Sequence, residues 1–389
     1  MRLPPSLVVS GHSSSSSPLV CKLKKSLYGL KQASRQWFSK LSEALVSRGY
    51  LSSKNDYSLF TKTSWGSLTV LAVYVDDILL AGDDTSELDA LKDFLDAIFK
   101  IKDLCSVHYF LGLEIIQQPQ GFLMCQHKFT SDLLEEFHCD HFTPVNTPLD
   151  HSIKLSSAMG ESLSDPSIYR RIVGKLNFLC HTRPDIAYSV QHLSQFLQAP
   201  QVPHMLATIH ILRYLMKAPD LDIFLPKSTD FSLLAYSDSH WATCAQTRRS
   251  VTGYYITLGG CPISWKSKKQ PTISLSSAEA EYRALRKVVA EISWLVRLLA
   301  DLGLVISSPV PVFCDSQAAL HIAKNPVFHE RTKHIEVDCH YVRDSIQSGL
   351  ITLHHISSSA QLADILTKSL PGTTHHHLLG KLGCQHPQA

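Results

Sequence analysis

Two adjacent carboxylates, Asp76 and Asp77, lie between apolar runs at residues 68–73 and 78–81. This pattern predicts a β-hairpin whose tight turn carries the acids. Neighbouring aspartates repel each other and have low strand propensity, so their position at a strand turn requires an explanation. A divalent cation bound through oxygen ligands would provide one. The alternative is an Asp–Asp turn that only makes local hydrogen bonds.

Four further carboxylates, Asp238, Glu279, Asp315 and Asp364, stand beside or within apolar segments of the C-terminal part. Burying acids in such surroundings is costly unless they are paired or bind a metal ion. We expect them on a strand, at a helix start, at a strand end and on a late helix, which can meet at one sheet edge. Two divalent ions held about 4 Å apart by such carboxylates activate water and stabilise the leaving oxygen in phosphodiester cleavage.

Each of these acids has a simpler explanation when it is taken alone. Ser276 and Glu279 fit a capping box, which accounts for Glu279 without any chemistry. Asp315 and Ser316 are suitable caps for the helix that follows them, and Asp364 fits the exposed face of its helix. Only the joint arrangement of the four carboxylates predicts a two-metal site.

Basic residues flank two strands expected in the same part of the chain, namely Arg248, Arg249, Lys266, Lys268 and Lys269. They are candidates for contacts to nucleic-acid phosphates. Lysines on an exposed strand edge also guard a sheet against edge-to-edge aggregation, and this alternative stays open.

The apolar pattern predicts an α+β N-terminal half. Helices are expected over residues 33–49 and 87–99, and strands over 57–60, 68–81, 109–116 and 121–124. Residues 140–166, rich in Pro, Ser and His, predict a loop, and residues 167–217 predict helices broken at prolines.

After about residue 230 the expected order is α/β with a mixed sheet. Strands are predicted over 233–236, 252–258, 262–266, 310–314 and 350–356, and helices over 277–302, 316–324, 335–347 and 360–370. We therefore divide the chain into a disordered tail (1–18), an α+β domain (19–139), a helical segment (140–230), an α/β domain (231–372) and a C-terminal tail (373–389).

Composition describes an ordinary globular chain of 389 residues, with 44% hydrophobic residues, 18% charged residues and a net charge of +3. The 10 cysteines include no CxxC pair, so reduced buried thiols are expected. The His-rich stretches at 138–141 and 375–377 are expected at the solvated surface. Neither a membrane helix nor a convincing secretory signal is present, so we expect no membrane partner and a cytoplasmic or nuclear location.

Several short motifs, in this order and spacing, resemble the Pol polyprotein of copia-type retrotransposons over nearly the whole chain after about residue 20. The reverse transcriptase part rests on Leu27-Tyr28-Gly29-Leu30-Lys31-Gln32-Ala33-Ser34-Arg35, Tyr74-Val75-Asp76-Asp77 and Thr182-Arg183-Pro184-Asp185-Ile186. The RNase H part rests on Tyr236-Ser237-Asp238, Trp265-Lys266-Ser267-Lys268-Lys269-Gln270, Ser276-Ser277-Ala278-Glu279-Ala280-Glu281-Tyr282, Asp315-Ser316-Gln317 and Ala363-Asp364-Ile365-Leu366.

The resemblance implies an RNase H site in which Asp238, Glu279, Asp315 and Asp364 hold two Mg²⁺ (or Mn²⁺) ions and hydrolyse the RNA strand of an RNA–DNA hybrid. Recognition would depend on hybrid shape and 2′-OH contacts, with Gln317 in the minor groove. The remaining contacts to nucleic acid or nucleotide would come from Lys31, Gln32, Arg248, Arg249, Lys268 and Lys269. Asp76 and Asp77 would be polymerase metal ligands.

The resemblance also implies an incomplete polymerase site. Family polymerases use a third Asp on a strand before the segment at 27–35, and this sequence has no Asp before Asp56. We therefore expect a truncated palm (19–139), a thumb and connection (140–230) and an RNase H-like domain (231–372), with polymerase activity absent from the chain alone. An intact retrotransposon Pol acting in trans is a candidate partner. The alternatives are a catalytically inactive nucleic-acid-binding remnant and a carboxylate nuclease or integrase that acts on DNA.

Overall fold

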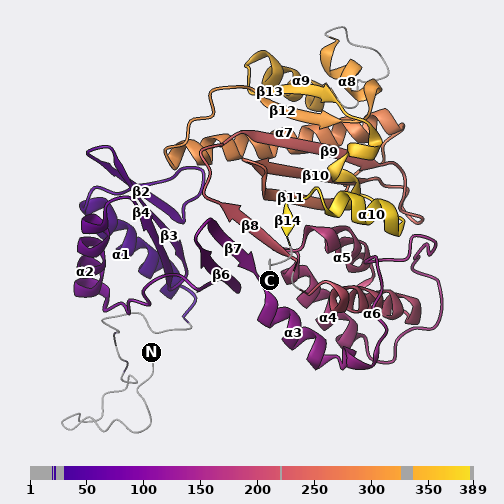
Figure 1. The fold of residues 1–389 in the computed structure, drawn as a ribbon, viewed down its shortest axis with the longest axis horizontal. Coiled ribbons are helices and arrows are strands. Elements are labelled where there is room, and N and C mark those ends of the chain that lie inside the picture. The colour runs from indigo at the N-terminus through magenta and orange to yellow at the C-terminus, as the bar shows by residue number, and fades with distance from the viewer. Residues whose placement is uncertain (1–19, 21, 23–29, 220, 326–335, 386–389) are drawn as a thin grey trace. The chain divides into compact units, whose positions relative to one another are not determined.

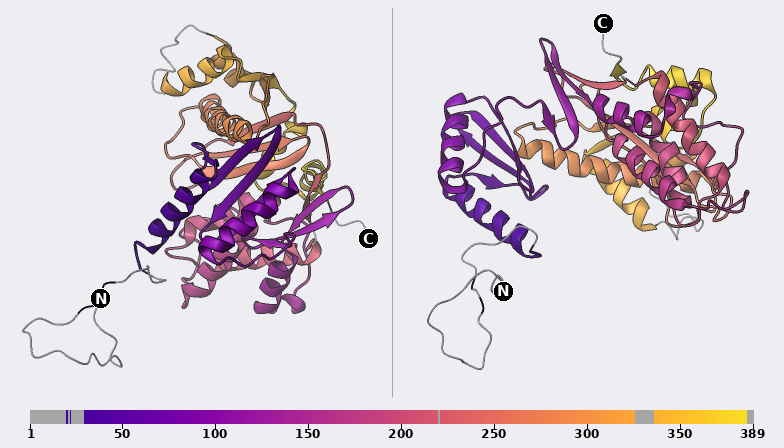
Figure 2. Two further views of the ribbon diagram at one scale, coloured as in Figure 1. Left: turned by 90° about the vertical axis from the view of Figure 1, so that its left-hand side faces the viewer. Right: turned by 90° about the horizontal axis from the view of Figure 1, so that it is seen from below.

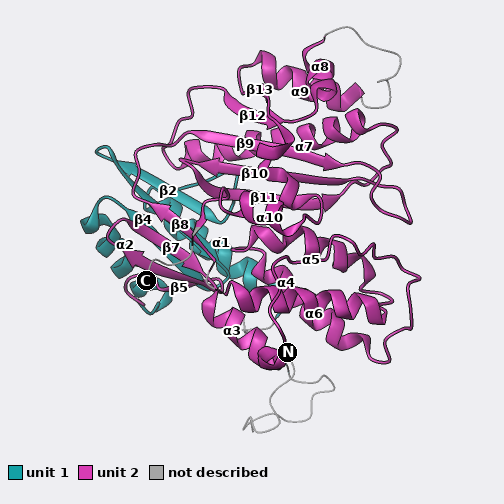
Figure 3. Cartoon of the chain, turned by 45° about the vertical axis from the view of Figure 1, so that its right-hand side comes forward, with its two compact units in different colours: residues 1–103 teal, residues 104–389 magenta. Residues whose placement is uncertain are grey.

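The computed structural model describes residues 20, 22, 30–219, 221–325 and 336–385. The chain divides into two compact units, Met1–Asp103 and Leu104–Ala389 (Figure 3). The expected N-terminal tail and part of the motif at 27–35 lie outside the described residues. Within these residues, none of the helices combines the length and apolar character that a bilayer-spanning segment needs.

Unit 1 is a four-stranded antiparallel sheet with two helices. Its strands β1 (Leu51–Ser52), β2 (Leu59–Ser64), β3 (Ser67–Tyr74) and β4 (Asp77–Gly82) pair in sequence order. Helices α1 (Ala33–Ser47) and α2 (Thr85–Phe99) bury Leu41, Leu45, Leu91 and Leu95 in the same core as Leu71 of β3. The predicted helices and the hairpin around Asp76 and Asp77 are confirmed.

Unit 2 contains a helical layer with its own apolar core. It consists of α3 (His127–Glu136), η1 (Cys139–His141), α4 (Pro166–Leu179), η2 (Pro184–Ile186), α5 (Ala187–Leu193), η3 (Ser194–Phe196) and α6 (Val202–Lys217). Leu133, Val173, Leu176, Val190 and Leu212 meet in this core. The helical segment predicted over 167–217 is confirmed, including its breaks near the prolines.

A first five-stranded sheet of unit 2 joins distant parts of the sequence. Its order is β14 (Cys384–Gln385), β8 (Asp222–Pro226), β7 (Gly121–Cys125), β6 (Leu113–Gln118) and β5 (Tyr109–Phe110), and all neighbours are antiparallel. The hairpin predicted over 109–124 is therefore present, but it pairs through β7 with a strand that comes after the helical layer.

The second five-stranded sheet is mixed, as predicted (Figure 1). Strands β11 (Cys261–Lys269), β10 (Val251–Leu258) and β9 (Leu233–His240) are antiparallel, and β9, β12 (Val310–Cys314) and β13 (Ile351–His355) are parallel. Among the described residues of this part are the helices α7 (Ser277–Asp301), α8 (Gln317–Lys324) and α9 (Glu336–Gln347).

Alternating residues of this sheet serve two cores on its two faces. Ala235 of β9 and Tyr254 and Ile256 of β10 pack with the apolar stripe of α7. Tyr236 and Tyr255 contact the opposite cluster, which includes η6 (Leu362–Leu366) and α10 (Gly372–Leu379). Figure 2 shows α7, in orange, running along the sheet. The sheet therefore holds a long helix on one face and a short 3-10 element on the other.

The C-terminal region differs from the prediction. The helix expected over 360–370 is replaced by two 3-10 elements, η5 (Ser358–Ala360) and η6, and Leu362, Ala363, Ile365 and Leu366 of η6 are all buried. The tail expected at 373–389 contributes α10 and β14 to unit 2. The two compact units meet between Asp103 and Leu104, and the pairing of β7 with β8 links residues on the two sides of the helical layer.

A buried ion pair connects the helical layer to the C-terminal region. Arg183 and Asp185 are each 2% exposed and lie 2.8 Å apart, from Nη2 to Oδ2. The Tyr214 hydroxyl donates to Asp185 and also lies 3.1 Å from Nε2 of His375. Burial lowers the pKa of His375 to about 4. The expectation that the histidines at 375–377 are all solvated is therefore wrong for His375.

Candidate active site

The sheet register places two predicted site residues side by side. β9 and β12 run parallel, with Val312 opposite Ala235 and Phe313 opposite Tyr236. Continuing this register by two residues beyond Tyr236 and Phe313 brings Asp238, near the end of β9, next to Asp315, which follows β12. Asp238 is 3% exposed and Asp315 is half-buried.

Asp364 reaches the same place from the 3-10 element η6. Gly253, the β10 partner of Asp238, allows η6 to approach the sheet, because a Cβ at this glycine would lie 2.6 Å from Thr367 and 3.0 Å from the Ala363 carbonyl oxygen. Asp364 is 6% exposed, so its explanation as an exposed helix residue is wrong. Carboxylate oxygens of Asp238, Asp315 and Asp364 lie within 4.8 Å of one another.

Neighbouring side chains hold these carboxylates in place. Nζ of Lys368 lies 2.9 Å from Asp364 Oδ1 and 3.7 Å from Asp238 Oδ2. The Ser358 hydroxyl donates to Asp315 at 2.7 Å, and the Thr367 hydroxyl donates to Asp238. One cation and two hydroxyls therefore contact three converging acids.

The structure brings Glu281 to the site and leaves Glu279 outside it. Glu279 accepts the Leu275 N–H at 2.8 Å and pairs with Arg283 at 2.8 Å, at the start of α7 where Ser276 is the N-cap. This geometry agrees with the capping explanation. Glu281 is 7% exposed, and one of its oxygens forms a group with Asp315 and the Cys314 thiol in which the ligand atoms lie within 4.8 Å of one another.

The position of Glu281 has a signal in the sequence. It shares a helical stripe with Leu285, Val288 and Ile292, which are all buried against the sheet. An acid in the apolar stripe of a long helix indicates a site more strongly than one in its first turn. Glu281 also accepts the Ser239 N–H at 3.0 Å, next to Asp238.

The electrostatics of the cluster oppose the simultaneous ionisation of all its acids. Burial, with repulsion from Asp238, raises the pKa of Asp364 to about 7, although Lys368 acts in the opposite direction. Burial, with repulsion from Asp238 and Asp315, raises the pKa of Glu281 well above its usual range. Burial disfavours the charge of Lys368, but Asp238 and Asp364 outweigh this effect and raise its pKa. Additional positive charge would therefore stabilise the ionised site.

The two acids of unit 1 lie at the turn between β3 and β4. Tyr74 pairs with Asp77, which leaves Val75 and Asp76 as the turn residues, and both aspartates are exposed. Val75 has a φ of 53°, a left-handed conformation that β-branched residues rarely adopt. Among the described residues, no third Asp, Glu, His or Cys joins Asp76 and Asp77 in a compact ligand group.

The predicted nucleic-acid contacts are distributed over several surfaces. Lys31, Gln32, Arg248, Lys268 and Gln317 are exposed, with Gln317 as the first residue of α8 two positions after Asp315. Arg249 is half-buried. Among the described residues, none of these side chains forms a hydrogen bond or an ion pair with the carboxylates of the cluster.

Strand β11 is an edge strand whose lysines line a cavity. The cavity has a volume of about 890 Å³ and lies between β11 and helices α4 and α5. Lys266, Lys268 and Lys269 line it, but Nζ of Lys269 already contacts Gln195 and Cys244 at 2.9 Å each. Both the phosphate and the edge-protection explanations stay compatible with this arrangement.

Comparison with known proteins gives matches along most of the chain. The family model for reverse transcriptase (RNA-dependent DNA polymerase) matches residues 4–151. The Pol polyprotein from transposon RE1 of Arabidopsis thaliana is 44% identical over 94% of this chain and 25% of that protein. A putative transposon Ty5-1 protein of Saccharomyces cerevisiae is 32% identical over 70% of this chain and 90% of that protein.

Among solved structures, an N-terminal RNase H domain from Mycobacterium tuberculosis is 12% identical over 39% of this chain and 97% of that chain, with a TM-score of 0.26. A prototype foamy virus protease–reverse transcriptase is 16% identical over 89% of this chain and 40% of that chain, with a TM-score of 0.25. The chain spans about a quarter of the length of the plant polyproteins that it matches. From the sequence relatives, the chain belongs to the family of copia-type retrotransposon Pol polyproteins, and residues 4–151 match the reverse transcriptase model.

Proposed function

We propose that unit 2 hydrolyses the RNA strand of RNA–DNA hybrids at a two-metal site formed by Asp238, Glu281, Asp315 and Asp364. The observation that carries this proposal is the convergence of Asp238, Asp315 and Asp364 from three separate elements, with ligand oxygens within 4.8 Å of one another. Glu281 takes the role that the sequence analysis gave to Glu279, because Glu279 is engaged in helix capping and an ion pair.

The donor set fits Mg²⁺ or Mn²⁺. Carboxylate oxygens are the ligands that these hard cations prefer. Burial, together with repulsion from the neighbouring acids, raises the pKa values of Asp364 and Glu281, and a bound cation would offset both effects. When bound, a pair of such ions generates a nucleophile from water and stabilises the leaving oxygen.

Other residues of the chain would position these ligands. The Thr367 hydroxyl orients Asp238, and the Ser358 hydroxyl orients Asp315. Lys368 balances part of the charge of Asp238 and Asp364, so it would keep the carboxylates together before metal binding. An approaching cation would compete with this ammonium group for the same oxygens.

The proposed substrate follows from the family and from the surroundings of the site. Gln317 is exposed two residues after Asp315, a position suited to a minor-groove contact with 2′-OH groups. Arg248 and Lys268 are exposed cations that would contact phosphates, and Arg249 and Lys269 would do so less readily because they are half-buried.

RNA-directed DNA polymerisation is the second activity that the family implies. The match of the reverse transcriptase model to residues 4–151 and the Asp76–Asp77 turn favour it. Two-metal polymerisation needs a further carboxylate beside this pair, and none of the described residues supplies it in a compact group. We therefore expect primer extension by this chain alone to fail, and robust nucleotide incorporation would contradict this expectation.

The test is cleavage of a labelled RNA–DNA hybrid by the purified chain with Mg²⁺. We expect Glu281→Gln, like Asp238→Asn and Asp315→Asn, to lower the rate at least 100-fold. The matched control Glu279→Gln, two residues away on the same helix, should keep most of the activity if it folds. Full activity of Glu281→Gln would refute the assignment.

Competing substrates separate this proposal from its alternatives. Duplex DNA cleaved faster than the hybrid would indicate a DNA nuclease. Binding of the hybrid without cleavage, at any Mg²⁺ or Mn²⁺ concentration, would indicate a catalytically inactive nucleic-acid-binding remnant.

A further inference from the structure

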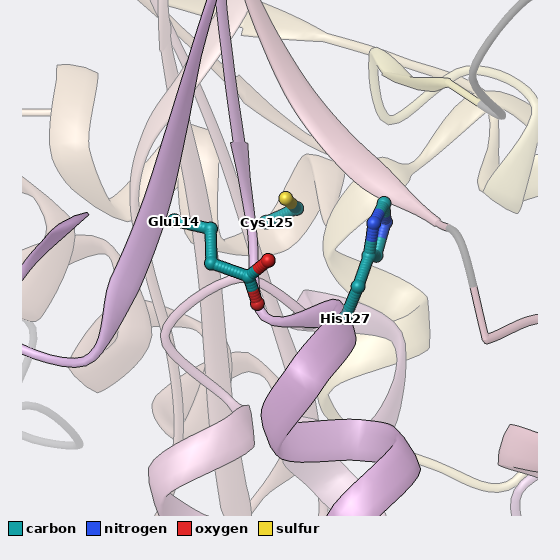
Figure 4. A group of neighbouring side chains, drawn as sticks. All are labelled: Glu114, Cys125 and His127. Carbon is teal, nitrogen blue, oxygen red and sulfur yellow. The ribbon is translucent and has the colours of Figure 1, made fainter. Parts of the chain in front are cut away.

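We propose that Glu114, Cys125 and His127 form a second metal site, selective for Zn²⁺, at the junction of β6, β7 and α3. One ligand atom from each residue lies within 4.8 Å of the other two. Figure 4 shows the three side chains grouped where β7 leads into the first turn of α3. This site is separate from the carboxylate cluster and serves no step of the proposed hydrolysis.

The local fold explains why these three residues meet. Glu114 of β6 is the direct antiparallel partner of Cys125, the last residue of β7. Directly opposed residues of an antiparallel pair project from the same face of the sheet. Gln126 then starts helix α3, so that His127 follows Cys125 by two residues and comes to the same side.

Two of the three ligands are already oriented by partners in the protein. Nε2 of His127 lies 2.8 Å from Oδ1 of Asp222, which is 1% exposed. A carboxylate bonded to one imidazole nitrogen fixes the ring and increases the basicity of the other nitrogen, an arrangement typical of zinc ligands. Glu114 accepts the Lys128 N–H at 2.8 Å, which fixes its carboxylate against the start of α3.

The chemistry of the donors selects the metal. One thiolate, one imidazole and one carboxylate form a mixed set that suits Zn²⁺, with water as a fourth tetrahedral ligand. Mg²⁺ prefers oxygen ligands only, so the two sites of unit 2 would differ in the ion that they take. Cys125 is fully buried at the end of β7, and its thiol would lose its proton on binding the ion.

Binding of the ion would stabilise the fold around the site. An ion at this position ties β6, β7 and α3 together and, through Asp222, also the start of β8. The strands β6, β7 and β8 form the central part of the sheet β14-β8-β7-β6-β5, and α3 follows β7 directly. Because metal binding to a folded site adds to folding free energy, Zn²⁺ should raise the melting temperature of the chain.

The competing explanation is purely structural. Cys125 would then be an ordinary core thiol, Glu114 a helix cap and His127 an ion-pair partner of Asp222. The two explanations differ in whether Zn²⁺ remains bound when Mg²⁺ is in excess and the carboxylate site is saturated.

The experiment measures zinc retained by the purified full chain. Protein stripped with a chelator is incubated with Zn²⁺ and millimolar Mg²⁺, desalted and analysed by mass spectrometry of the metal. We expect about one Zn²⁺ per chain for the wild type and at least a 10-fold weaker affinity for Cys125→Ser and for His127→Gln. Cys139→Ser, which changes another buried cysteine of unit 2, is the matched control and should retain the metal.

A second readout guards against loss of folding in the variants. Co²⁺ in place of Zn²⁺ should give the charge-transfer absorption of a cobalt–thiolate bond in the wild type and in Cys139→Ser, and not in Cys125→Ser. Far-UV circular dichroism checks that each variant is folded. If Cys125→Ser does not fold, His127→Gln, which changes a half-buried residue, replaces it as the test variant. No retained zinc in the wild type, or zinc and the cobalt band unchanged in folded Cys125→Ser, would overturn the proposal.

Discussion

Replacing Asp364 by Asn should stabilise the metal-free protein at alkaline pH while removing hydrolysis. In the folded chain, burial and repulsion from Asp238 raise the pKa of this carboxyl from 3.8 to about 7. The folded state then binds more protons than the unfolded state between these pH values. The contribution of Asp364 to the free energy of unfolding is therefore greatest near pH 4 and falls as the pH rises through about 7.

The size of this change in the free energy of unfolding follows from the pKa difference between the folded and unfolded states. At 1.36 kcal/mol per pH unit, the change from 3.8 to about 7 corresponds to about 4 kcal/mol as an upper bound. Asn resembles the neutral carboxyl in shape and still accepts a hydrogen bond from Lys368. We expect Asp364→Asn to match the wild type near pH 4 and to exceed it by about 1–4 kcal/mol above pH 8.

The assay is urea denaturation with chelator present, over pH 4 to 9, comparing the two proteins at each pH. Asp132→Asn, at an exposed position of α3, controls for the loss of a negative charge elsewhere. A variant that is less stable than the wild type at pH 8.5, or a stability difference independent of pH, would refute the reasoning. Mg²⁺ should reduce the difference in stability between Asp364→Asn and the wild type, because only the wild type keeps all the carboxylates that would bind the ion.

Two further predictions concern residues that shape the site and the core. Gly253→Ala should lower the rate of hybrid cleavage by about 10–100-fold, because the added Cβ would displace η6 and Asp364 by a fraction of an ångström or more. The control Gly174→Ala, which has open space around it, should leave the rate unchanged. Arg183→Met should lower the free energy of unfolding by about 3–5 kcal/mol, because Asp185 would remain buried without its partner. Urea denaturation measures this loss, and full stability of Arg183→Met would contradict the prediction. The double variant Arg183→Met/Asp185→Leu leaves no unpaired charge and should be more stable than Arg183→Met.

The periodicity of apolar residues in the sequence predicted the helices and strands that bury one face more than the other. The helices α1, α2 and α7 and the strands β9 and β12 each have residues that alternate between more and less buried positions, so apolar spacing located them, whereas β10 is buried along almost its whole length and was recognised by its apolar run. The break between β5 and β6 was missed because it depends on Leu111 and Gly112, both with positive φ values. Gly112 is constrained there by the Phe178 ring, which would lie 2.3 Å from a Cβ and belongs to a distant helix.

Tertiary contacts explain what the sequence could not predict. His375 is buried because its ring meets Tyr214, which lies 161 residues away. η6 is buried on all sides, so no amphipathic pattern distinguished it from an α-helix. For the site, the motif that contains both Glu279 and Glu281 was found, but the choice between them required the face of α7 that meets β9 and β12.

The pairing of β14 with β8 imposes an order in time on folding. Unit 1 builds its sheet from strands adjacent in sequence, so its contacts can form as soon as those residues leave the ribosome. In unit 2, Gly121 can pair with Pro226 only after residue 226 has been synthesised, and Ile223 can pair with Cys384 only after residue 384 has been synthesised. Until then the edges of β7 and β8 stay unpaired and open to association with other chains. We therefore expect an interval during synthesis in which unit 1 can fold while the unpaired strand edges of unit 2 are exposed to aggregation.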